Sequence, residues 1–232
     1  MSENTTGRDI PLNKPSIDVD TEFIFRLTHP SEAEINVFSG DSFYRYPEEF
    51  NRLEDHMRRH IEGGNGDYFV LCVGASTGKE PLSVVLSWEE MVRTINPQYD
   101  GTVGVLAVER NLEAIAAFQQ NNFPVFGSRD NQLERVMRYV SARTPLSEGI
   151  QSPAFIKPEA FVSFPEGIIK RITYLQIDAE SPQVSELHKV FRADSFNAAI
   201  CHTTSRYFSN EVTSMQRIRG TLGNGGFLSH VR

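Results

Sequence analysis

Three carboxylates stand just past apolar segments of the chain, where they can take part in binding a cofactor. The apolar segments are Tyr68–Val73, Val103–Val108 and Ile172–Ile177, and the carboxylates that follow them belong to Glu80, Glu109 and Asp178. Because the carboxyl ends of parallel strands meet at one edge of a sheet, we expect these three side chains to lie close together. Taken singly, each is more simply an exposed loop carboxylate, and it is the set that predicts a site.

A glycine turn separates the first apolar segment from Glu80. It reads Gly-Ala-Ser-Thr-Gly-Lys over positions 74 to 79. The phosphate-binding loop of nucleotidases is disfavoured, because that motif needs glycine where Val73 stands and serine or threonine where Glu80 stands. The turn also lacks the dinucleotide fingerprint G-x-G-x-x-G. Glycine still lets the backbone approach a ligand closely, so we expect the cofactor to contact Gly74, Ala75, Ser76 and Thr77.

A zwitterionic cofactor with an adenosine end fits this pattern best. Glu80 can pair with an ammonium group, and Glu109 can accept hydrogen bonds from ribose hydroxyls. Asp178, at a third strand end, is placed to reach the adenine or its neighbours. These three functions match the groups of S-adenosylmethionine, which is therefore the predicted cofactor.

The order of expected elements predicts a doubly wound α/β fold with a Rossmann-like sheet and a small inserted subdomain. Two further strands are expected at Phe196–Cys201 and Phe227–Val231, with Gly223–Gly226 as the loop before the last one. Apolar spacing and capping residues predict helices at Pro47–Ile61, Lys79–Arg93, Leu112–Asn121, Leu133–Ala142 and Asn210–Leu222.

Two parts of the chain are expected to lie outside the main sheet. Residues 1–34 are polar, read as a flexible arm, and include one short candidate strand at Thr21–Thr28. Residues 35–232 are expected to form one α/β domain that holds the predicted cofactor site. Its insertion, at about 128–171, is rich in proline, serine and glycine between residues 145 and 167 and is expected to be irregular or short-stranded.

Composition limits the possible environment and partners. The 232 residues carry a net charge of −7, which argues against nucleic acid as the main partner, since phosphate binding needs a basic face. The two cysteines, Cys72 and Cys201, fall in apolar segments and form neither a disulfide framework nor a zinc site. No signal peptide or membrane span is recognised, so we expect a cytoplasmic protein without a membrane partner.

Small basic and histidine clusters have simple structural explanations. Arg58, Arg59 and His60 cluster on one expected helix, where a solvated face is the plainest interpretation. His56 and His60 have i, i+4 spacing that can bind a metal, but the sequence offers no third ligand beside them. We therefore predict no metal site and a solvated helix face.

Four stretches resemble the chemotaxis-receptor methyltransferases (the CheR family), which methylate protein glutamates with S-adenosylmethionine. The turn Gly-Ala-Ser-Thr-Gly-Lys-Glu-Pro-Leu-Ser is similar to the family's G-C-S-T-G-E-E-P-Y-S, the most specific match. Phe-Tyr-Arg-Tyr-Pro-Glu-Glu-Phe at 43–50 is similar to F-F-R-D-P-x-x-F. Val-Leu-Ala-Val-Glu at 105–109 resembles I-x-A-T-D. The stretch 196–208 resembles F-D-x-I-x-C-R-N-V-x-I-Y-F.

The resemblance implies roles for individual residues. Arg45 would contact the cofactor carboxylate and shape the reaction site, and Tyr207 would lie near the transferred methyl group. Glu80 and Glu109 would hold the ammonium and the ribose, and Asp178 stands where the family has an asparagine beside the adenine. Cys201 and Thr203 fall on motif positions next to the cofactor. The methyl acceptor would be a protein or small-molecule nucleophile, and the oligomeric state is not implied.

Some residues have two interpretations. His202, where the family has arginine, is either a hydrogen-bonded histidine at a strand end or a catalytic base for a hydroxyl or amine acceptor. Asp41 and Thr203 also depart from the family pattern. The aromatic rings of Phe43, Tyr44 and Tyr207 suit a sulfonium, and for Phe43 and Phe208 core packing is preferred. At the level of function, the enzyme has one alternative, a non-catalytic sensor of S-adenosylmethionine or S-adenosylhomocysteine.

Overall fold

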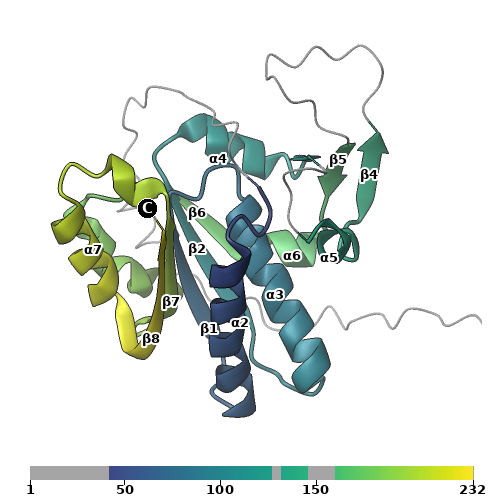
Figure 1. Cartoon of the computed structure of the whole chain (residues 1–232), viewed down its shortest axis with the longest axis horizontal. Coiled ribbons are helices and arrows are strands. Elements are labelled where there is room, and N and C mark those ends of the chain that lie inside the picture. The colour runs from purple at the N-terminus through teal and green to yellow at the C-terminus, as the bar shows by residue number, and fades with distance from the viewer. Residues whose placement is uncertain (1–41, 127–131, 146–159, 232) are drawn as a thin grey trace, which may run out of the picture.

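The computed structural model of this chain describes residues 42–126, 132–145 and 160–231 (Figure 1). The expected arm at residues 1–34, the strand Thr21–Thr28 within it, and Asp41 lie outside the described residues. So do two stretches of the expected insertion, 127–131 and 146–159.

The centre of the molecule is a parallel sheet of five strands. Its spatial order is β6-β2-β1-β7-β8, and every pair of neighbours is parallel. The strands are β1 (Tyr68–Val73), β2 (Val103–Glu109), β6 (Ile172–Gln176), β7 (Phe196–His202) and β8 (Leu222–Val231). The chain winds outward from β1 through β2 to β6, then crosses to β7 and winds the other way. The predicted doubly wound fold is confirmed, with its topological switch point between β1 and β7.

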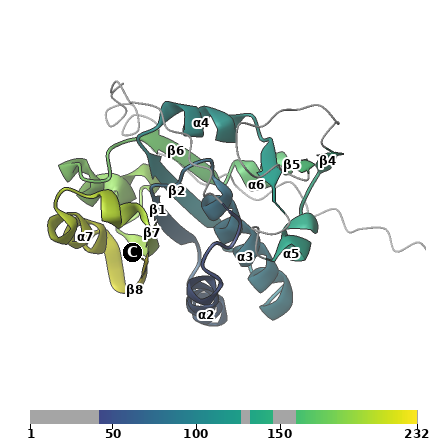
Figure 2. The ribbon, with the colours of Figure 1, turned by 45° about the horizontal axis from the view of Figure 1, so that its top comes forward.

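Helices cover both faces of this sheet (Figures 1 and 2). On one face lie α2 (Pro47–Glu62) and α3 (Lys79–Ile95), and on the other lie the 3₁₀ helix η1 (Pro182–Phe191) and α7 (Glu211–Gly220). The strands are apolar on both sides because successive side chains alternate between the two layers. In β1, Val70 and Cys72 join the α2/α3 core, whereas Leu71 and Val73 join the core under η1 and α7.

Helix α2 illustrates how the sequence specifies this packing. Phe50, Leu53, Met57 and Ile61 recur at helical spacing, and all four are buried. Pro47 begins the helix, where its missing N–H costs no hydrogen bond, and two glutamates in the first turn favour the helix dipole. This one apolar stripe packs the helix against α3 and the sheet.

A small antiparallel sheet and two short helices occupy the segment between the central strands β2 and β6. The strand order of this sheet is β3-β5-β4, with bounds Phe123–Val125, Ala160–Ser163 and Ala142–Pro145. The short helices are α5 (Leu133–Met137) and α6 (Glu166–Ile169), while α4 (Leu112–Gln119) follows β2. The expected helix Leu133–Ala142 was too long: it ends at Met137, and Ala142 begins β4, where pairing with β5 replaces helical hydrogen bonds.

The last strand is also longer than expected. Residues Gly223–Gly226 were expected as a loop, but they belong to β8, which pairs with β7 from Phe196 to His202 with one irregularity in register. The register pairs Phe196 with Leu222 and Ala198 with Phe227, so the four residues 223–226 lie at a bulge between paired positions, where glycine is common. Within the described part of the chain, no helix is long and apolar enough to cross a membrane.

The histidines of α2 are half-buried, which corrects the solvated face expected for them. The ring of His56 contacts the Tyr68 hydroxyl (2.6 Å) and the Gly225 carbonyl oxygen (3.0 Å), and His60 contacts the Gly66 carbonyl oxygen (3.1 Å). Burial lowers the pKa of both imidazoles. Among the described residues, no group of three or more histidine, cysteine, aspartate or glutamate side chains is placed to hold a metal.

Candidate cofactor and active site

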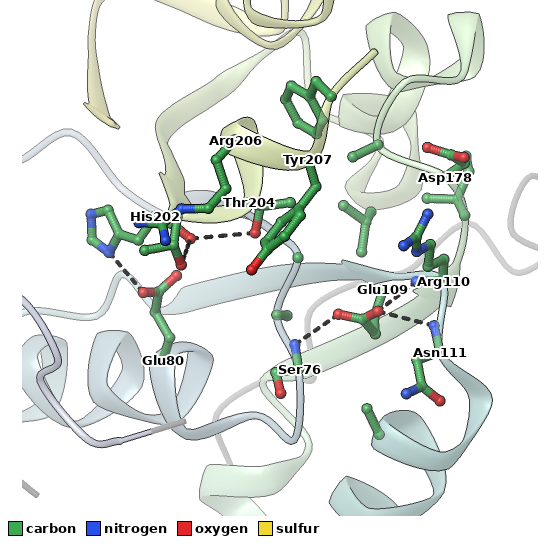
Figure 3. A pocket seen from close by; sticks show the side chains of 18 of the residues that line it. Ser76, Glu80, Glu109, Arg110, Asn111, Asp178, His202, Thr204, Arg206 and Tyr207 are labelled. Carbon is green, nitrogen blue, oxygen red and sulfur yellow. Dashed lines mark hydrogen bonds and ion pairs between the residues drawn. The ribbon is translucent and has the colours of Figure 1, made fainter. Parts of the chain in front are cut away.

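A cavity of about 310 Å³ lies at the carboxyl end of the sheet (Figure 3). It opens at the switch point, where doubly wound sheets bind their ligands. Ten of the expected site residues line it: Arg45, Gly74, Ala75, Ser76, Glu80, Glu109, Asp178, His202, Thr203 and Tyr207. Thr77 and Cys201 are not among the lining residues.

The glycine turn after β1 forms the floor of the cavity. Gly74 has φ +71°, and a Cβ built there would lie 2.0 Å from the Thr204 hydroxyl oxygen. Only glycine fits this backbone conformation and this contact without displacement. The Tyr174 hydroxyl, near the carbonyl oxygens of Ala75 (3.3 Å) and Ser76 (3.1 Å), fixes the turn from β6, two strands away from β1.

Glu109, the last residue of β2, is held by backbone amides. Its Oε2 accepts a hydrogen bond from the Ser76 N–H (2.9 Å), and its Oε1 accepts from Arg110 (2.9 Å) and Asn111 (3.0 Å). A carboxylate offers about four acceptor positions, so three bonds leave room for another donor on Oε2. The side chain is thereby fixed beside the glycine turn, in an orientation suited to a further donor such as a hydroxyl (Figure 3).

Glu80, in the first turn of α3, is held by a side chain instead. Its Oε2 lies 2.7 Å from Nδ1 of His202, at the end of β7. The other ring nitrogen of His202, Nε2, lies 2.6 Å from the Ser229 hydroxyl oxygen, so both ring nitrogens are occupied. The imidazole is almost fully buried, with 2% of the side chain exposed. Of the two interpretations of His202, the hydrogen-bonded histidine at a strand end describes these contacts.

The cysteine thiols near Glu80 stay protonated. Burial is the main cause that raises the pKa of Cys201 to about 12, and the negative charge of Glu80 adds to it. The same two causes raise the pKa of Cys72. Cys201 therefore belongs to the packed core behind the cavity, and the structure does not bring its side chain to the cavity wall.

Arg45, Thr203 and Tyr207 lie on the same wall of the cavity. Nη1 of Arg45 donates to the Thr203 hydroxyl at 3.4 Å, a long contact, and the guanidinium lies over the Tyr46 ring. Thr203 has φ +57°, a conformation uncommon for threonine. Tyr207 belongs to the 3₁₀ helix η2 (Thr204–Tyr207), and its ring extends from that helix toward the cavity (Figure 3). It is 63% exposed, so the cavity is open on this side.

Asp178 lies past β6, where its Oδ1 accepts a hydrogen bond from the Glu180 N–H (2.8 Å). Glu180, not expected from the sequence, joins this wall to α7. Its Oε1 accepts from the Asn210 N–H (3.0 Å) and the Ser209 hydroxyl (2.9 Å), and the backbone bond to Asn210 is the main cause that lowers the pKa of Glu180. This contact holds the start of α7 against the cavity rim.

Several lining residues were not predicted. Some directly follow predicted acids, and position alone would have found them: Arg110, Asn111, Ala179 and Glu180. Others had no individual signal, namely Ser42, Ala114, Thr204 and Arg206. Phe208, for which core packing was preferred, is partly buried against the core and also lines the cavity. The core role preferred for Phe43 is confirmed, and Tyr44 is fully buried as well, so neither ring reaches the cavity wall.

Comparisons with known proteins give likenesses of structure only. No protein-family model matches the chain, and no curated protein matches it. Among solved structures, it is similar to an S-adenosylmethionine-dependent methyltransferase from Geobacter sulfurreducens in complex with S-adenosyl-L-homocysteine, at 14% identity and a TM-score of 0.39, covering 91% of this chain and 55% of that one. The glycopeptide N-methyltransferase MtfA with S-adenosylmethionine matches at 13% identity and a TM-score of 0.40, over 86% of this chain and 59% of that one.

A third likeness is to the methyltransferase CalH in complex with S-adenosylhomocysteine, at 12% identity and a TM-score of 0.42, covering 76% of this chain and 35% of that one. The chain thus spans between 35% and 59% of the length of these three structures. With identities below 25% and TM-scores below 0.5, these likenesses carry no conclusion about chemistry, which rests on the site itself.

Proposed function

We propose that this chain binds S-adenosylmethionine in the cavity at the carboxyl end of the sheet and transfers its methyl group to an acceptor. One observation carries the proposal: Glu80 and Glu109 stand on either side of the glycine turn, at the switch point, and both line the same cavity. An ammonium group and a ribose, which the sulfonium-bearing chain of one ligand holds apart, match this pair of carboxylates.

The other lining residues fit the rest of the cofactor. Gly74 brings the backbone close enough for the amino-acid end to lie beside Glu80, and Arg45 can pair with its carboxylate. Glu109 retains acceptor capacity for the ribose hydroxyls. The adenine would lie against Ile177 and Ala179, next to Asp178, which offers acceptors to its exocyclic amine.

The chemistry requires alignment more than acid–base catalysis. S-adenosylmethionine supplies an electrophilic methyl on a sulfonium, which a nucleophile takes by in-line displacement. The chain has to orient the acceptor and exclude water around it. Tyr207 and Arg45 lie where they can do so, one with an aromatic face suited to a positive charge and the other with a guanidinium suited to an anionic acceptor.

A carboxylate is the acceptor that this cavity suits best. It is ionised near pH 7 and needs no general base. A hydroxyl or amine acceptor would draw on His202, whose two ring nitrogens are both engaged by Glu80 and Ser229. The resemblance to protein-glutamate methyltransferases agrees with this choice, and the carboxylate can belong to a protein or to a small molecule.

The alternative is a non-catalytic sensor of the cofactor or its demethylated product. The exposure of Tyr207 favours it, because an active site for methyl transfer has to exclude water from the reacting groups. Incubation of the protein with radiolabelled cofactor and fractionated cell lysate separates the two. Label transferred by the wild type and lost in Tyr207→Phe and Arg45→Ala indicates an enzyme; binding without transfer indicates a sensor.

Calorimetry with S-adenosylmethionine and S-adenosylhomocysteine tests the proposal itself. We expect both ligands to bind with dissociation constants in the micromolar range, about −8 kcal/mol. The exposed glutamate Glu113, which does not line the cavity, provides a matched control: Glu113→Gln should bind like the wild type, whereas Glu109→Gln should not. Absence of binding of either ligand to the wild type would contradict the proposal.

A further inference from the structure

Behind Glu80, a chain of hydrogen-bonding side chains leads from the cavity to the start of α2. The Glu80 carboxylate contacts Nδ1 of His202, Nε2 of His202 contacts the Ser229 hydroxyl, and that hydroxyl lies 3.1 Å from Oε2 of Glu49. Ser229 is 1% exposed and His202 is 5% exposed, so this relay runs through the interior. Glu49 itself is paired with the exposed Arg52 (2.8 Å).

Counting hydrogens settles the protonation state that fits these contacts. Ionised carboxylates only accept, so Glu80 requires a hydrogen on Nδ1 of His202 and Glu49 requires the single hydrogen of the Ser229 hydroxyl. With its hydrogen committed to Glu49, Ser229 must accept from Nε2 of His202. All three contacts are therefore made only when both ring nitrogens carry hydrogen, which is the imidazolium cation.

The groups that face this imidazolium from each side are consistent with a cation. On the cavity side it meets Glu80, and through Ser229 it meets Glu49; these are its two carboxylates. From α2 and the preceding loop, the rings of Tyr46 (4.8 Å between centroids) and Phe50 (6.3 Å) pack against it edge-on and carry no charge. Other titratable groups nearby are the protonated thiols of Cys72 and Cys201, which respond to the Glu80 charge, and the Arg45 guanidinium, which contacts the adjacent Thr203.

We infer that His202 is a positioning residue whose proton is exchanged for the ammonium group of the cofactor, so that binding at Glu80 releases a proton through Ser229 and Glu49. This inference rests on the proposed function, because it assumes that Glu80 receives the ammonium. Two cations on one carboxylate repel each other, and the cofactor cannot give up its charge below pH 7, where an α-amino group stays protonated.

The proton balance is simple. When the ammonium group approaches Glu80, Nε2 of His202 gives its proton to the Ser229 oxygen while Ser229 gives its own hydrogen to Glu49, which passes it to water. His202 keeps the hydrogen on Nδ1, so Glu80 stays in place and its charge becomes available to the ligand. One proton enters solution for each cofactor bound to a protein that began in the imidazolium form.

Calorimetry of S-adenosylhomocysteine binding at pH 6.0, in buffers of different ionisation enthalpy, measures this release directly. We expect a net release of protons and an affinity that rises between pH 5.5 and pH 7.0 by up to about tenfold per pH unit. The control ligand is 5′-methylthioadenosine, which has the ribose and adenine but no ammonium; it should bind without proton release. Equal release with both ligands would overturn the inference.

Variants locate the effect on the relay. His202→Asn keeps a donor toward Glu80 but cannot titrate, so its affinity should be independent of pH over this range. Ser229→Ala removes the contact that requires the second ring hydrogen and should reduce the release. If a variant fails to fold, ¹⁵N chemical shifts of the His202 ring in the wild type decide: two N–H nitrogens without ligand and one with it are expected, and an unchanged ring contradicts the inference.

Failure of the inference and failure of the proposed function give different results. No binding of either ligand contradicts the function. Binding of S-adenosylhomocysteine with no proton release and no pH dependence leaves the function standing and overturns the role given to His202.

Discussion

The two sides of the cavity hold their carboxylates in different ways. On the β2 side, Glu109 is fixed by three backbone N–H groups, which the fold supplies whatever the pH. On the β7 side, Glu80 is fixed by the imidazole of His202, a side chain that titrates. A carboxylate held by backbone amides is a constant feature of the site, whereas one held by a histidine responds to protons and to single substitutions.

A substitution in the glycine turn that separates the two sides should have the largest effect, a loss of folding stability. In Gly74→Ala the added Cβ meets Thr204 at 2.0 Å and the backbone has φ +71°, so we expect a loss of about 3 kcal/mol or more in unfolding free energy. Gly66→Ala is the matched control, because φ is +79° there with open space around the Cβ; it should lose only about 1–2 kcal/mol. Chemical denaturation measures both, and equal losses would mean that Thr204 yields freely.

Glu109→Gln removes the carboxylate that backbone amides hold in place. The amide cannot accept from all three backbone N–H groups and loses the charge that strengthens bonds to the ribose. We expect S-adenosylhomocysteine to bind about 30- to 150-fold more weakly, equivalent to 2–3 kcal/mol, at every pH between 5.5 and 7.5. An unchanged dissociation constant in calorimetry would remove Glu109 from the cofactor site.

Glu80→Gln removes the carboxylate that His202 holds in place. It should weaken cofactor binding less than Glu109→Gln does, and by an amount that depends on pH. At low pH His202 already compensates the Glu80 charge, so removing that charge costs little; near pH 7 the loss should reach about tenfold, or 1.4 kcal/mol. The ratio of variant to wild-type dissociation constants, measured at pH 5.5 and 7.0, reports the difference. A ratio that does not change with pH would show that the two carboxylates behave alike.

Tyr207→Phe tests whether the open side of the cavity acts in methyl transfer or in cofactor binding. The ring is 63% exposed, so its hydroxyl contributes little to cofactor binding, and we expect the affinity to change by less than about threefold, under 0.7 kcal/mol. If the chain is an enzyme, single-turnover methyl transfer should slow by more than the affinity changes, because the hydroxyl then acts on the acceptor. Equal changes in both quantities would assign Tyr207 to cofactor binding alone.

Substitution of the two histidines of α2, which do not line the cavity, should have the smallest effect, a change in how stability depends on pH. Burial lowers the pKa of His56 and His60, so below pH 6.5 the unfolded chain binds more protons than the folded one, and stability falls as the pH falls. His56→Gln and His60→Gln should each flatten this decline, as measured by denaturation between pH 7.5 and pH 5.5. A steeper decline in either variant would contradict the direction of these pKa shifts.

The sequence predicted the elements whose side chains form a continuous pattern. Strands such as β1 and β2 are apolar throughout because both faces are covered, and the carboxylates that follow them reached the cavity as expected. Helix α2 followed from its apolar spacing and its proline start. Arg110 and Asn111 adjoin Glu109 in the sequence and were within reach of the same argument.

The sequence could not predict contacts between residues that are far apart along the chain. Ser229 and Glu49 are 180 positions apart and Glu80 and His202 are 122 apart, so no local spacing connects the relay. The start of β8 was missed because Gly223–Gly226 carries no strand-like side-chain pattern and lies at a bulge in the pairing with β7. Thr77 and Cys201 were expected at the site from neighbouring motif positions, yet the turn and the strand direct them elsewhere.

A crystal structure of this protein with S-adenosylhomocysteine tests the central claim most directly. We predict the ligand over the glycine turn, its ribose hydroxyls within hydrogen-bonding distance of Glu109 and its amine within hydrogen-bonding distance of Glu80. A ligand bound elsewhere, or in this cavity with either carboxylate turned away from it, would contradict the account.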